Sequence, residues 1–197
     1  MERTLWTVGY GAWPAPRRAE KLVEALLHRG VTRLVDVRLN PCASDMQPGR
    51  PYGPKPWNLQ AGTEGIVGLL AGAGIAYEWI VELGNPQRQD PASTILRAQL
   101  ADPRGEWPVH RGLERLANGV REPEAVVALL CACKEASRCH RSLIAQALAD
   151  RYFKGALTFR DVRSATIDPV ERREGPSSMG AKPEEEEPQR TQRVTEK

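Results

Sequence analysis

The sequence of 197 residues lacks any apolar run that approaches the length of a membrane span. Such a span takes about 20 consecutive apolar residues, and the N-terminus, MERTLWTVGYG, also lacks the long apolar core of a signal peptide. The composition, with 41% hydrophobic and 27% charged residues, excludes collagen and coiled-coil classes. We therefore expect a globular, cytoplasmic protein that has no membrane partner.

Several familiar motifs are missing as well. The sequence contains neither a Walker motif nor the Gly-x-Ser-x-Gly elbow, and Gly9-Tyr10-Gly11 is too short for a dinucleotide fingerprint, which requires three spaced glycines. No standard nucleotide-binding or hydrolase signature therefore identifies the function, so only individual residues can indicate it.

The last 30 residues, 168–197, have no aromatic side chain and almost no large aliphatic one. They hold 8 acidic and 6 basic residues, a net charge of −2, so the rest of a chain of net charge +3 carries +5. A segment of this kind cannot bury enough apolar surface to offset its ordering entropy. We predict an α/β domain over residues 1–167 and a disordered charged tail over 168–197.

Hydrophobic periodicity in the first 167 residues alternates between strand and helix patterns. This alternation predicts a three-layer α/β fold, with a mostly parallel sheet of about five strands and helices on both faces. The Pro- and Gly-rich segment 40–56 is expected to be a functional or flexible loop. We expect strands at 5–8, 33–37, 75–81, 125–131 and 156–162, and helices at 17–29, 63–73, 91–101, 109–118 and 142–150.

Ligands of parallel sheets bind beyond the carboxyl ends of the strands, so the residues that follow each strand are candidates for the site. The densest group is LLCACKEASRCHR, residues 129–141. In one interpretation its loop and Arg141 hold an anion while Cys131 or Cys139 acts as a reactive thiolate.

Two further interpretations of the cysteine-rich segment remain open. Cys131, Cys133, Cys139 and His140 are residue types that zinc prefers, and they would form a tetrahedral set. Alternatively, the cysteines fill space in the core, because cysteine is commonly buried.

An acid and an arginine lie two residues apart at the end of the second expected strand. Asp36 and Arg38 therefore face the same side, either as a structural ion pair or as an acid or base beside an anion clamp. Glu82, after the third strand, is either a second carboxylate of the site or a capping residue.

These strand-end motifs resemble the domain of unknown function 488 family over residues 4–162. The resemblance implies a bacterial, cytoplasmic α/β protein whose functional positions are Asp36, Arg38, Cys131, Cys139, His140 and Arg141. Cys133 departs from the pattern, which has glutamate there in many relatives. The matching residues are Gly9, Tyr10, Asp36, Val37, Arg38, Pro41, Leu83, Gly84, Cys131, Ala132, Cys139, His140 and Arg141.

The leading hypothesis is an enzyme, a hydrolase or transferase with a reactive thiol and no cofactor, that acts on a phosphorylated or other anionic substrate such as a nucleotide or nucleic acid. The alternative is a non-enzymatic binding module with a zinc site or purely structural cysteines. The sequence leaves the oligomeric state open. In the leading hypothesis the catalytic residues are Asp36, Cys131, Cys139 and His140, and the substrate-binding residues are Gly9, Tyr10, Arg38, Glu82 and Arg141.

Overall fold

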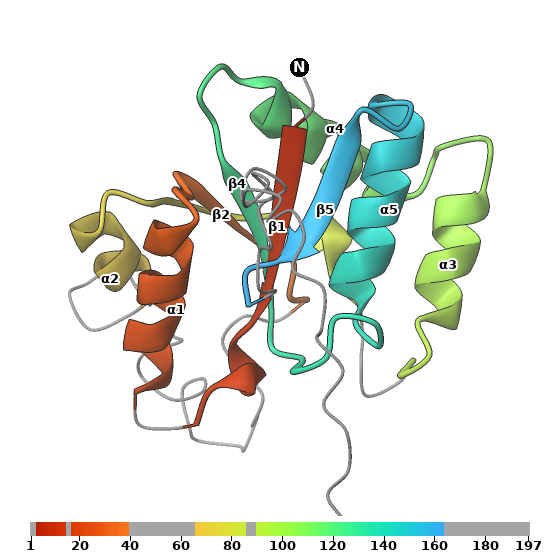
Figure 1. Cartoon of the computed structure of the whole chain (residues 1–197). Coiled ribbons are helices and arrows are strands. Elements are labelled where there is room, and N and C mark those ends of the chain that lie inside the picture. Colours follow the sequence, from red (N-terminus) through yellow and green to blue (C-terminus); the bar gives the residue numbers. More distant parts are fainter. Residues whose placement is uncertain (1–2, 15–16, 40–65, 86–89, 164–197) are drawn as a thin grey trace, which may run out of the picture. The chain divides into compact units, whose positions relative to one another are not determined.

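A sheet of five parallel strands forms the centre of the structure, in the order β3-β2-β4-β1-β5 (Figure 1). The computed structural model describes residues 3–14, 17–39, 66–85 and 90–163. All five residues of the central strand β4 are buried, as its unbroken apolar run predicts. The strands are β1 (Arg3–Gly9), β2 (Arg33–Asp36), β3 (Ala76–Trp79), β4 (Val127–Cys131) and β5 (Leu157–Asp161).

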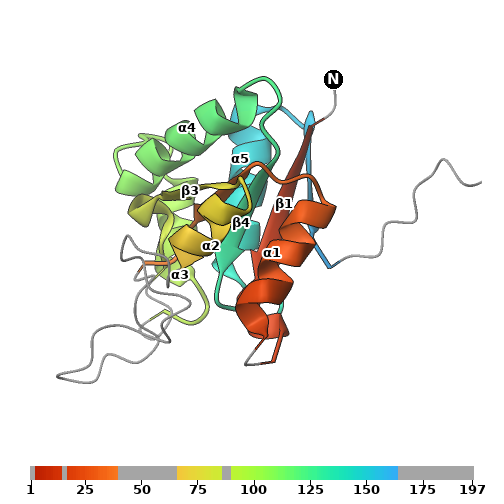
Figure 2. The same ribbon diagram turned by 90° about the vertical axis from the view of Figure 1, so that its left-hand side faces the viewer.

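Helices cover both faces of this sheet, which confirms the predicted α/β fold. Figure 2 shows α1 (Arg18–His28) and α2 (Ile66–Gly72) in front of the sheet, with α3 (Thr94–Ala101) and α5 (His140–Tyr152) behind it. The fifth helix, α4 (Pro108–Arg121), packs into the same core as α3 and α5. The two helical layers bury separate hydrophobic clusters against the two faces of the sheet.

The boundaries differ from the sequence prediction in two places that matter for the site. The third strand ends at Trp79, and Val81–Leu83 forms a short 3-10 helix, η3, rather than the end of the strand. Helix α5 begins at His140, two residues earlier than predicted, with Cys139 as its N-cap. The predicted loop over 40–56 and the predicted tail over 168–197 lie outside the described residues.

The chain leaves neighbouring strands of the sheet on opposite faces. After β1 and β2 it forms α1 and α2 on one face, whereas after β4, which lies between β1 and β2, it forms α5 on the other face. The carboxyl end of β4 is therefore a topological switch point, where open α/β sheets bind their ligands. None of the helices in the described part of the chain is long and apolar enough to cross a membrane.

Candidate functional site

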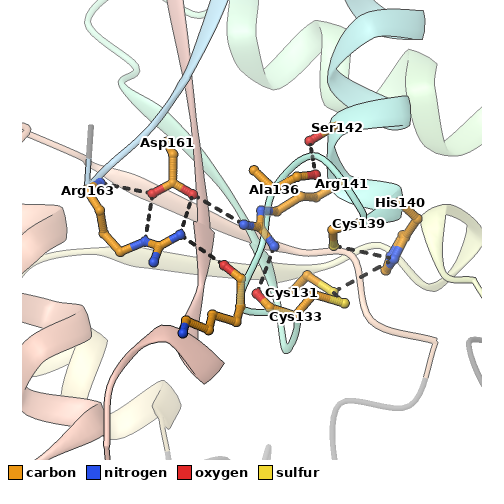
Figure 3. Close-up of polar contacts among 10 residues, drawn as sticks. Cys131, Cys133, Ala136, Cys139, His140, Arg141, Ser142, Asp161 and Arg163 are labelled. Atoms are coloured by element: carbon orange, nitrogen blue, oxygen red, sulfur yellow. Dashed lines mark hydrogen bonds and ion pairs between the residues drawn. The ribbon is translucent and has the colours of Figure 1, made fainter. Parts of the chain in front are cut away.

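Three cysteine side chains meet at the carboxyl end of β4 (Figure 3). Cys131 ends the strand, Cys133 lies in the loop that follows, and Cys139 caps α5, so the turn of the loop brings all three Sγ atoms within 4.8 Å of one another. The sulfurs of Cys131 and Cys133 are 3.8 Å apart. Cys131 and Cys139 are buried and Cys133 is half-buried.

His140 adds a nitrogen donor to the three sulfurs. Its Nδ1 lies 3.8 Å from the sulfur of Cys131 and 3.9 Å from that of Cys139. Its Nε2 lies 2.7 Å from the carbonyl oxygen of Val37, which follows β2. Because a carbonyl only accepts, Nε2 carries the proton, and Nδ1 of the neutral ring presents its lone pair to the thiols.

Three of the six separations among these four donor atoms are close to those of a tetrahedral metal site. With zinc about 2.3 Å from sulfur and about 2.0 Å from nitrogen, tetrahedral ligands lie about 3.8 Å apart for two sulfurs and about 3.5 Å apart for sulfur and nitrogen. The sulfur–sulfur distance of 3.8 Å and the two sulfur–nitrogen distances of 3.8 Å and 3.9 Å are within about 0.4 Å of these values. The three sulfurs thus lie close enough together to hold one metal ion, with His140 beside two of them.

The surroundings of Cys131 and Cys133 raise the pKa values of these two thiols. A hydrogen bond with Cys133 lowers the pKa of Cys131, but a hydrogen bond with Cys139 and burial outweigh this effect and raise the pKa to about 12. The hydrogen bond with Cys131 likewise raises the pKa of Cys133. A nucleophilic cysteine at neutral pH requires the opposite shift.

Arg141 fixes the backbone of the cysteine loop. It is completely buried, donates from Nη1 to the carbonyl oxygen of Cys133 at 2.9 Å, and pairs through Nη2 with Asp161 at 3.2 Å. Arg163 pairs with the same carboxylate and donates to the carbonyl oxygen of Lys134 (Figure 3). Two guanidinium groups and one carboxylate leave a local charge of +1 beside the thiols.

Gly9 and Gly11 allow the cysteine loop to approach β1 closely. A Cβ atom on Gly9 would lie 1.8 Å from the carbonyl oxygen of Cys133, and one on Gly11 would lie 2.4 Å from that of Ala132. The amide of Gly11 also donates to the Ala132 oxygen at 3.1 Å. The backbone after β1 therefore supports the loop that carries the thiols.

Asp36 and Arg38 form a buried, bidentate ion pair. The closest contact, from Nη2 of Arg38 to Oδ2 of Asp36, is 2.5 Å, and the hydroxyl of Tyr77 donates to the same oxygen at 2.7 Å. Arg38 also lies 5.3 Å above the ring of Tyr10. Burial alone would lower the pKa of Arg38, but the hydrogen bonds and charge of Asp36 hold it above the usual value. The two side chains thus form an ion pair, and the roles of Asp36 as acid or base and of Arg38 as anion clamp stay predictions.

Comparison with known protein families places part of this site in a known domain. The sequence model described as Domain of unknown function DUF488 matches residues 55–148. The chain carries a DUF488 domain. No curated protein and no solved structure matches the chain.

The DUF488 match is narrower than the resemblance over residues 4–162, and it separates the site into two parts. The cysteines, His140 and Arg141 lie inside the matched range, whereas Asp36 and Arg38 precede it. Val37 connects the two parts, because its carbonyl oxygen receives the hydrogen bond from His140. The predicted roles of these residues in catalysis and substrate binding stay predictions.

Glu82 belongs to a different set of contacts within the DUF488 domain. Its Oε2 lies 3.7 Å from Nη1 of Arg115 on α4, and the described part of the chain shows no contact between Glu82 and the cysteines. Three residues of the site were missed at the sequence level, and one of them, Arg163, lies two residues after the end of β5. Asp161 ends β5 and the strand-end rule would have found it, whereas Tyr77 lies inside β3 and carries no such signal.

Proposed function

We propose that this DUF488 protein binds one zinc ion through the sulfurs of Cys131, Cys133 and Cys139 and through Nδ1 of His140. The observation that carries the proposal is the convergence of the three sulfurs within 4.8 Å of one another, with Nδ1 of His140 3.8 Å and 3.9 Å from those of Cys131 and Cys139. Four protein ligands fill the coordination sphere of zinc, so the site is structural and leaves no position open for a reacting water. Its role is to fix the β4–α5 loop of a binding module.

Residues around the four donors support this assignment. Metal-bound histidines usually donate from their second ring nitrogen to a carbonyl or carboxylate, which fixes the tautomer and the orientation of the ring. His140 makes such a bond to Val37. Arg141 in turn fixes the backbone of Cys133, which is the most exposed of the three cysteines.

The charge around the site favours a divalent ion. Zinc with three thiolates and a neutral imidazole carries −1, which the +1 of Arg141, Arg163 and Asp161 balances. A monovalent copper ion in the same ligand set would leave −2, and hard cations such as magnesium prefer oxygen ligands. The observed donors and their surroundings thus fit zinc best.

An enzyme that acts on an anionic substrate is the competing hypothesis. It requires a thiolate nucleophile and arginines that are available to the substrate. In the described residues, however, Arg38 and Arg141 each pair with a carboxylate, and Arg141 has no exposed surface. To bind a substrate anion these arginines would have to leave their carboxylates, whereas zinc binding leaves both ion pairs in place.

Metal analysis of protein purified without added zinc distinguishes the two. We expect about one zinc per chain, and less than about a tenth of that in Cys131→Ser or Cys139→Ser, because each loses a thiolate ligand. Cys42→Ser is the matched control, since the four donors are complete without this cysteine, and it should keep the metal. Cobalt in place of zinc should give the visible absorption of a tetrahedral thiolate site.

Two results would overturn the proposal. Protein free of metal, with a thiol that reacts rapidly with iodoacetamide below pH 7, would favour the enzyme, because such reactivity requires a low thiol pKa. Equal zinc content in the native protein and in both cysteine variants would place the ion elsewhere.

A further inference from the structure

A pocket of about 420 Å³ lies beside the cysteine site, between the start of α3 and the start of α5. Cys139 forms part of its wall, so the pocket and the cluster share one residue. The volume falls within the range of about 300 to 1,000 Å³ that is common for sites of small ligands. The pocket is therefore large enough for a small metabolite.

The walls of this pocket carry positive charge and no negative charge. Arg97 from α3 and Arg138 from the loop before α5 both line it, and no acidic residue does. Within the described residues neither arginine side chain has a hydrogen bond or an ion pair, whereas Arg104 and Arg115, for example, each pair with a carboxylate. Two guanidinium groups at one pocket are thus available to an anion.

Other groups on the pocket wall complement this charge. Ser137, next to Arg138, has a hydroxyl with no partner among the residues that the structure describes, and Leu143 adds an apolar side chain. Guanidinium groups bind phosphate oxygens in a planar, bidentate manner, and hydroxyls donate to the remaining oxygens. An apolar wall suits the carbon skeleton of the same ligand.

We infer that this pocket binds a small phosphate monoester, with the phosphate held by Arg97 and Arg138 and the organic part against Leu143. The inference does not depend on the zinc site. It also differs from an anion site at Arg38 and Arg141, because those side chains are occupied by carboxylates.

Calorimetric titration of the full chain with glycerol 3-phosphate tests the inference, with glycerol and citrate as neutral and carboxylate probes. We expect saturable binding of glycerol 3-phosphate alone. The double variant R97Q/R138Q should weaken binding at least tenfold, because each charge-assisted contact to a phosphate contributes about that factor or more. The double variant R111Q/R160Q removes two exposed arginines that do not line the pocket, and should change the affinity less than twofold.

Each of the other outcomes would overturn the inference. Absence of saturable binding would exclude the pocket as a phosphate site, and equal binding of citrate would exclude the assignment to phosphate. If both double variants bound glycerol 3-phosphate with equally reduced affinity, the binding would depend on the net charge of the protein and not on this pocket. Zinc content, measured in the same samples, should stay native in both, so failure of this inference and failure of the zinc proposal give different results.

Discussion

Replacement of Gly9 by alanine tests whether the close contact between β1 and the cysteine loop maintains the site. The new Cβ would lie 1.8 Å from the carbonyl oxygen of Cys133 and 2.8 Å from Nη1 of Arg141. Since real contacts of Cβ are essentially never under 3.0 Å, the two backbones must separate by about 1.2 Å. Gly9 pairs with Cys131 in the parallel ladder, so such a shift also disturbs the end of β4.

The expected cost has two parts. Overpacking of a tight backbone contact costs about 1 to 3 kcal/mol, and loss of a hydrogen bond from the buried charge of Arg141 adds about 1.5 to 3 kcal/mol. Together the two parts come to about 2.5 to 6 kcal/mol, and a loss of only about 3 kcal/mol in a protein of this size lowers the melting temperature by about 6 to 12 °C. A zinc site tolerates shifts of only about 0.2 Å in its ligand distances, so metal should be lost as well.

Thermal unfolding followed by circular dichroism, together with zinc analysis, measures both effects. Gly72→Ala is the matched control, because a Cβ at this position in α2 would meet nothing within 4 Å. That variant should be neutral or stabilised by up to about 1 kcal/mol. If Gly9→Ala kept the native melting temperature and a full complement of zinc, the reasoning about close approach would be refuted.

Two further predictions concern the buried polar groups. Asp36→Asn leaves the Arg38 charge buried without its partner and should lower the free energy of unfolding, measured in urea, by about 3 to 5 kcal/mol. The control Glu20→Gln removes one partner of an exposed ion pair and should lower it by less than about 1 kcal/mol. Similar losses in the two variants would contradict the expectation that burial sets the cost. Burial raises the pKa of Tyr10, and burial with the charge of Asp36 raises that of Tyr77. The folded state thus retains these protons more firmly than the unfolded state, so stability should fall as the pH rises above about 10. An absorbance titration of the native protein, Tyr10→Phe and Tyr77→Phe measures the pKa of each phenol in the folded state. A pKa near the usual value of about 10 for either phenol would contradict the predicted upward shift.

The fold was predictable because its signals are local. The apolar run that became β4 and the helical spacing of Leu22 and Leu26 in α1 report on which side chains leave water, and they identify strand or helix without reference to the rest of the chain. The boundaries differ from the prediction where a tertiary contact decides them. The amide of Ile80 donates to the carbonyl oxygen of Asp36, after which the chain turns into η3 instead of extending β3.

The candidate site could be located from the sequence but its chemistry could not be chosen. The strand-end rule identified Cys131, Cys139 and His140, since the carboxyl ends of parallel strands share one edge. Whether the thiols form a nucleophile, a metal site or core packing depends on distances between their sulfurs, which spacing along a loop does not determine. Likewise, residue types alone left Arg38 either as an anion clamp or as the partner of Asp36.

The sequence by itself therefore determined the alternation of strands and helices, the all-apolar central strand and the edge of the sheet at which the polar residues gather. Only the tertiary structure decided which groups face one another there. His140 and Val37 are 103 positions apart, yet the bond between them orients the imidazole. Arg141 and Asp161 meet from different elements, and their ion pair leaves the arginine fully buried. The physical reason is that hydrophobic periodicity is a property of neighbouring residues, whereas hydrogen bonds, ion pairs and metal ligation depend on distances in space between residues far apart in the chain.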